Sequence, residues 1–76
     1  MYVQAILINK HNLNKREAKK YVKKMGYDPI KKAHETENYY RFRINDPNLF
    51  DIFSTVKIND IVTIVFGDFE RTYDNS

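Results

Sequence analysis

The stretch Tyr39-Tyr40-Arg41-Phe42-Arg43-Ile44 decides the fold class that the sequence predicts. Its even-numbered positions are apolar or aromatic, while its odd-numbered positions hold Tyr39, Arg41 and Arg43. Strict alternation over six residues is typical of a strand with one buried and one exposed face. We therefore expect a strand over residues 38–45, paired through a short polar turn with a preceding strand over residues 30–36.

The segment before this hairpin predicts a helix over residues 14–25. Asn14 and Glu17 have the spacing of a capping box, and Leu13 can pack on Ala18 as a hydrophobic staple. Gly26 follows the apolar stripe and is expected to be a left-handed cap. The stripe itself consists of Ala18, Tyr21, Val22 and Met25.

Two further apolar runs, at residues 2–8 and 61–66, predict strands, and Gly67 ends the second. Asp46-Pro47 has the form of an N-cap followed by proline in the first turn, so a second, short helix is expected there. Its apolar anchors would be Leu49, Phe50, Ile52 and Phe53. A turn is expected at Asn59-Asp60.

The predicted order is β-α-β-β-α-β, so the fold class is α+β with the ferredoxin-like split βαβ layout. That layout has a four-stranded antiparallel sheet, with a long first helix and a short second helix on one face. Right-handed crossovers would put the first and third strands in the middle. The brevity of the second helix leaves a less compact α+β hairpin arrangement open. We expect one domain over residues 1–67 and a polar C-terminal tail over residues 68–76.

Composition narrows the class of protein. With 76 residues the chain can form one small core, and without cysteine it has neither disulfides nor thiolate metal sites. The apolar N-terminal run lacks the basic start of a signal peptide, and no run is long enough to span a membrane. The sequence therefore predicts a protein that is neither secreted nor membrane-bound.

Charge is unevenly distributed along the chain. Residues 1–32 carry nine Lys or Arg residues against two acids, whereas residues 33–76 carry four against eight. This asymmetry indicates an anionic partner or a head-to-tail contact between copies. Lys, Asn, Ile and Tyr are abundant and have AT-rich codons, so part of the lysine excess can also reflect genome composition.

The exposed side of the 38–45 strand is the first candidate site. Tyr39, Arg41 and Arg43 would lie beside Tyr2 and Gln4 of the first strand, and sheet-based RNA binders of this topology stack bases on aromatic side chains at such positions. The chain lacks the glycine-containing RNP1 pattern, so it is not an RNA recognition motif.

Two alternatives compete for this face of the sheet. Arg41 and Arg43 could form ion pairs with Glu35 and Glu37 across the hairpin, which would leave only a solvated surface. The face could also form a protein interface, because an apolar patch ringed by Arg and Tyr has that composition. The patch would consist of Ile6, Ile8, Ile61 and Val65.

The predicted first helix is the second candidate site. Its solvent side is strongly basic, and Glu17 is the only acid near it, so it could follow the phosphates of a nucleic acid or a membrane surface. A solvated lysine face is the alternative. The basic residues are Lys15, Arg16, Lys19, Lys20, Lys23 and Lys24. Because this helix covers one side of the sheet and the arginines occupy the other, a single groove over both is not expected.

No catalytic site is expected. His11 and His34 are the only histidines, and no nucleophile and base, paired carboxylates or glycine-rich phosphate loop can be recognised. The sequence therefore predicts a protein that is not an enzyme and needs no metal, cofactor or small-molecule substrate.

The segment Gly26–Pro47, which contains His34-Glu35-Thr36-Glu37-Asn38-Tyr39-Tyr40-Arg41-Phe42-Arg43, resembles small, largely uncharacterised proteins and domains of tailed phages and large DNA viruses. The resemblance extends to Val3-Gln4-Ala5-Ile6, Glu17-Ala18 and the run from Ile61 to Gly67. It implies a viral origin, and hence a place in the host cytoplasm or the virion.

These observations predict a non-enzymatic viral or phage accessory protein that binds nucleic acid through the basic helix or the Tyr/Arg face. The predicted binding residues are Tyr39, Arg41, Arg43, Lys15, Lys19, Lys20 and Lys23. The alternative is a protein-interaction or assembly module, a homo-oligomer or a virion component, that uses the open face of the sheet.

Overall fold

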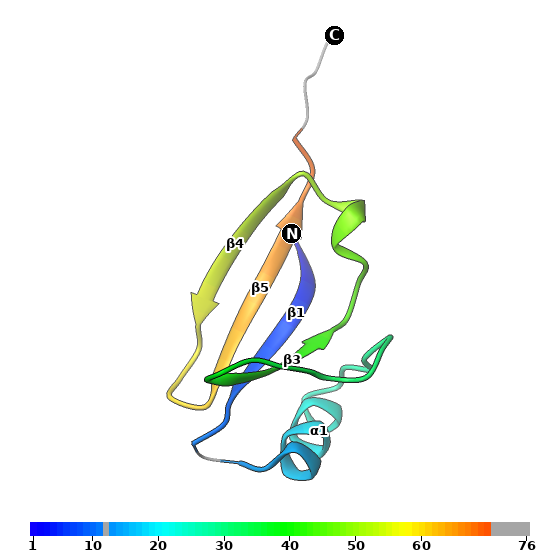
Figure 1. Cartoon of the computed structure of the whole chain (residues 1–76). Helices are drawn as coiled ribbons and strands as arrows, with labels where there is room; N and C mark the ends of the chain where they lie inside the picture. The colour runs from blue at the N-terminus through cyan, green and yellow to red at the C-terminus, as the bar shows by residue number, and fades with distance from the viewer. Residues whose placement is uncertain (12, 71–76) are drawn as a thin grey trace, which may run out of the picture.

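The computed structural model describes residues 1–11 and 13–70 (Figure 1). In this part of the chain one helix packs on a five-stranded antiparallel sheet with the strand order β2-β3-β1-β5-β4. The elements are β1 (Tyr2–Asn9), α1 (Lys15–Lys24), β2 (His34–Glu35), β3 (Tyr39–Arg43), a 3-10 turn (Pro47–Leu49), β4 (Ile52–Lys57) and β5 (Val62–Asp68). The predicted α+β class is confirmed.

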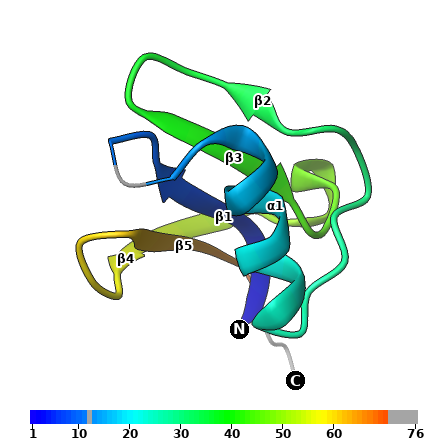
Figure 2. The ribbon, with the colours of Figure 1, turned by 90° about the horizontal axis from the view of Figure 1, so that it is seen from below.

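The core lies between α1 and one side of the sheet, which we call the helix face (Figure 2). Strand register explains its composition, since Ile6 of β1 lies between Phe42 of β3 and Ile64 of β5. Ala18 and Val22 of α1 pack on this row and are fully buried. Side chains at the intervening positions point to the other side of the sheet, the open face.

Helix α1 begins and ends as its sequence predicts. The Asn14 side chain accepts a hydrogen bond from the backbone N–H of Glu17, and the Asn14 backbone N–H donates to the Glu17 carboxylate, at 2.9 and 3.0 Å. Gly26 has a φ of +97°, and Tyr27 donates back to the carbonyl of Val22, as in a Schellman motif. The ends of this helix are therefore determined by short-range hydrogen bonds.

The prediction of a second helix is wrong. Asp46 caps the backbone N–H of Asn48 as expected, but the turn ends at Leu49, and β4 follows in place of a helix. β5 has a free side that β4 fills by antiparallel pairing. Phe50 also packs over Gly67, where a Cβ atom would overlap its ring. Pairing and packing with β5 thus override the local helical spacing.

The four-stranded ferredoxin-like layout is not observed, because β4 takes the place of the second helix. β1 is the central strand, between β3 and β5. The strand expected over residues 30–36 is reduced to the two residues of β2, and residues 30–33 form a loop along α1.

The C-terminal end of the domain also differs from the prediction. β5 continues through Asp68, and the Phe69 ring lies 5.6 Å from that of Phe50 between centroids, so these two residues belong to the folded domain. Of the rest of the predicted polar tail, the backbone N–H of Glu70 donates to the Asp51 carboxylate, and residues 71–76 lie outside the described residues.

Candidate nucleic-acid interface

A hollow of about 870 Å³ lies between α1 and the loop that leads to β2. Its rim and walls carry six basic side chains and one acid, Asp28. The basic residues are Lys15, Arg16, Lys19, Lys23, Lys31 and Lys32. Phe42, which is only 2% exposed, lies at the base on the helix face.

Helix periodicity lines up three of these cations. Lys15, Lys19 and Lys23 are four residues apart, so they repeat about every 6 Å along one side of α1. Ala18 and Val22 occupy the buried side of the same helix. Packing of the apolar stripe therefore turns the lysine row toward the loop.

A second hollow, of about 570 Å³, lies on the other side of that loop. Arg41 and Arg43 of β3 line it from the open face, together with His34 of β2. Lys31, Lys32 and Ala33 border both hollows. The two basic surfaces, expected to be separate, are thus linked around the β2 edge of the sheet. We call this surface the basic band: Lys15, Arg16, Lys19, Lys23, Lys31, Lys32, Arg41 and Arg43.

The cations of the basic band are not neutralised by ion pairs. Over residues 1–11 and 13–70, the ion pairs join Lys10 to Glu35, Lys57 to Asp60 and the N-terminal amine to Asp68, and none involves the band. Eight basic side chains and one lining acid therefore form a surface that attracts anions.

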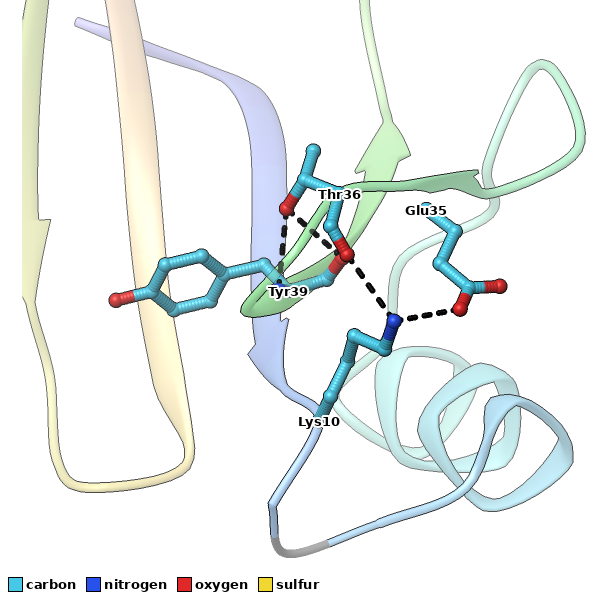
Figure 3. A network of polar contacts seen from close by, with 4 residues as sticks. All are labelled: Lys10, Glu35, Thr36 and Tyr39. Atoms are coloured by element: carbon cyan, nitrogen blue, oxygen red, sulfur yellow. Dashed lines mark hydrogen bonds and ion pairs between the residues drawn. The ribbon is translucent and has the colours of Figure 1, made fainter.

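The alternative pairing of Arg41 and Arg43 with Glu35 and Glu37 is not observed in residues 1–11 and 13–70, and Glu35 points to the helix face. The Lys10 Nζ atom donates to Glu35 at 2.5 Å and to the Thr36 carbonyl at 3.1 Å (Figure 3). The hydrogen bond and the charge of Lys10 lower the pKa of the Glu35 carboxyl below its ordinary value of 4.5. Lys10 thus ties the end of β1 to the hairpin and holds Glu35 on the face of the sheet opposite to the two arginines.

Arg41 is held in position by a buried glutamine. Its Nη2 atom donates to the Gln4 Oε1 atom at 3.0 Å, and the Gln4 Nε2 atom donates to the Asn45 carbonyl at 2.9 Å. Gln4 lies at a bulge in β1 and is fully buried, not exposed as expected. A neutral partner orients the guanidinium without cancelling its charge.

The predicted aromatic platform is not formed. Tyr39 lies opposite Asn9, whereas Tyr2 lies opposite Gly67 at the other end of β1, seven residues and roughly 23 Å away. Leu7 and Ala5, not aromatic residues, are the neighbours of Arg41 and Arg43. Tyr39 instead closes the hairpin turn with Thr36 (Figure 3), and like Lys20 it lines neither hollow.

The predicted apolar patch is not found on the open face either. Ile6 and Ile8 are fully buried in the core beneath α1, because their register partners Phe42 and Tyr40 face the helix. Val65 lies on the open face but is only 7% exposed, and Ile61 is partly buried against the core.

Two residues of the basic band, Lys31 and Lys32, are not among the residues that the sequence predicts to bind, because a regular strand is expected over residues 30–36. The signal that indicates them is their position two and three residues after Pro29 in the strongly basic first part of the chain. Arg16 is expected on the basic side of the helix and lines the first hollow, although it is not one of the predicted binding residues.

Comparison with family models, with curated proteins and with solved structures gives no significant match for this chain. In the described part of the chain, no group of three or more His, Cys, Asp or Glu side chains could hold a metal ion. Across residues 1–11 and 13–70, no helix has the length and apolar character needed to span a membrane.

Proposed function

We propose that this chain is a non-enzymatic protein that binds single-stranded nucleic acid through the phosphate backbone, with the basic band as the binding surface. The observation that carries the proposal is the continuity of the band. Its two hollows share Lys31 and Lys32, so cations follow one another from α1 around the sheet edge to Arg43.

The path of the basic band favours a single strand over a duplex. Duplex DNA is stiff, with a persistence length of about 50 nm, and cannot bend around the edge of so small a domain. A single strand is flexible enough to follow the loop from the helix face to the open face. The lysine row on α1 offers successive cations to successive phosphates.

The chemistry of the basic band indicates binding without base recognition. Phe42 is the one Phe, Tyr or Trp residue in its lining, and it is buried and cannot stack on a base. His34 supplies the one exposed aromatic ring, so stacking is limited to a single side chain. Lysine and arginine contacts to phosphates depend strongly on salt and carry no sequence information. We therefore expect similar affinity for DNA and RNA single strands of different sequence.

The test is fluorescence anisotropy with a labelled single-stranded DNA, the same sequence as RNA, and the matching DNA duplex, all at low salt. Single strands should bind more tightly than the duplex. The variant Lys31→Ala/Lys32→Ala removes the junction of the band and should weaken binding at least about tenfold.

The matched control is Lys20→Ala/Lys24→Ala, which removes the same charge from exposed positions that line neither hollow. It should change affinity much less. Absence of binding to either single strand at low salt contradicts the proposal. Equal weakening by the two variants would mean that binding follows net charge and not the band.

A further inference from the structure

β4 is an open edge of the sheet. It pairs with β5 on one side, and no described strand pairs with its other side (Figure 1). All six of its residues are exposed, including Ile52, Phe53 and Val56 at 46, 47 and 42%. Alternate backbone N–H and C=O groups of such a strand point outward and are available to another strand.

β4 also lacks the features that protect natural edge strands. Its pairing with β5 is regular from Ile52 to Lys57, with no bulge, and it contains no proline. Its one charged residue, Lys57, lies at the end. Exposed edges of this length and composition favour pairing with another chain.

We propose that β4 pairs antiparallel with β4 of a second copy of this chain, with the twofold axis through Ser54. In this register Ile52 lies opposite Val56 of the second copy, and Phe53 lies opposite Thr55. Directly opposite residues in antiparallel strands point to the same face. The Ile52–Val56 pairs therefore lie on the helix face, and the Phe53–Thr55 pairs lie on the open face.

Charge complementarity selects a second copy as the occupant and also selects the register. Asp51, next to the strand, lies opposite Lys57 of the second copy, and the twofold axis repeats this pair. The Lys57–Asp60 contact within one chain is 3.6 Å long and exposed, so Lys57 can reach the new partner. A shift of two positions would instead put Lys57 opposite Phe53, or Asp51 opposite Thr55.

This dimer is independent of the proposed nucleic-acid binding. β4 and β2 are the two opposite edges of the sheet, and the basic band passes around the β2 edge. Pairing through β4 would form a ten-stranded sheet with both α1 helices on one face. The basic bands of the two copies would stay exposed at the two far ends of this sheet.

The test is the mass in solution, measured by light scattering and sedimentation velocity over a wide range of concentration. We expect a dimer of twice 9.1 kDa. Ser54→Lys puts two like charges opposite each other at the axis and should weaken the dimer at least about tenfold. Asn48→Lys adds the same charge at an exposed position outside the strand and should leave the dimer unchanged.

A charge-reversal cycle tests the register. Asp51→Lys and Lys57→Asp should each weaken the dimer, because like charges then face each other, and the double variant should restore it. A monomer at millimolar concentration overturns the proposal. So does a dimer that resists Ser54→Lys, or a double variant that is weaker than both single variants.

Discussion

The contact between Phe50 and Gly67 predicts whether replacing Gly67 with alanine raises or lowers the free energy of unfolding. Replacing glycine with alanine within a strand normally stabilises a protein by about 0.5–1 kcal/mol. Gly67 does not have a positive φ, so its backbone conformation allows alanine. A Cβ atom there would nevertheless overlap the Phe50 ring, which is 8% exposed. Overpacking of this kind costs about 1–3 kcal/mol, so we expect Gly67→Ala to destabilise the fold.

The overlap should disappear when the ring is removed. Phe50→Leu keeps an apolar side chain and should cost no more than about 1.5 kcal/mol by itself. In that background Gly67→Ala should cost less than about 1 kcal/mol, because the leucine can move aside, so the two substitutions should not be additive.

Urea unfolding followed by circular dichroism measures these differences. A chain of this length is expected to have a free energy of unfolding of about 4–11 kcal/mol and an m-value near 1 kcal/mol/M, so Gly67→Ala should lower the midpoint by about 1–3 M. If Gly67→Ala stabilises the protein, or costs the same with Phe50 and with leucine, the Phe50 contact does not anchor the segment before β4.

Two further predictions concern charge. The variant Arg41→Ala/Arg43→Ala removes two proposed phosphate contacts. It should reduce the slope of log K, the association constant for a single strand, against log salt concentration by about 1.4. An unchanged slope measured by anisotropy would exclude these arginines from the interface. The Glu35 carboxylate has a lowered pKa in the fold because Lys10 donates to it, so its contribution to stability is present above pH 4.5 and is lost as the pH falls through the folded pKa. In the Glu35→Gln variant the free energy of unfolding should therefore fall less steeply below about pH 5, as measured by urea titrations at several pH values. If it falls as steeply as in the original chain, the Lys10–Glu35 pair contributes nothing to stability.

The helix and the alternating strand could be predicted from sequence because their causes are local. Asn14, Glu17 and Gly26 act through hydrogen bonds and backbone conformation within a few residues. The alternation around Arg41 and Phe42 needs only one buried face to produce β3. The cations of α1 could be placed in the same way, because the position of Ala18 determines which side of the helix is exposed.

The structure after Asp46 depends on contacts that are distant in sequence. The spacing of Phe50 and Phe53 is compatible with a helix and with a turn followed by a strand, and the proline cap suits both. The choice is made by the free side of β5 and by the space above Gly67, which only the assembled sheet provides. The spacing of apolar residues within one segment does not show which strand of the sheet lacks a neighbour.

The same distinction applies to the candidate site. The basic first part of the chain and the row of exposed lysines on α1 can be predicted without the fold. The folded chain is needed to show that Lys31 and Lys32 join this row to Arg41 and Arg43, and that Glu35 is turned away toward Lys10. A loop that runs around the edge of a sheet brings together side chains from both of its faces. The periodicity of a single helix or strand describes each face separately and does not show that the two surfaces meet.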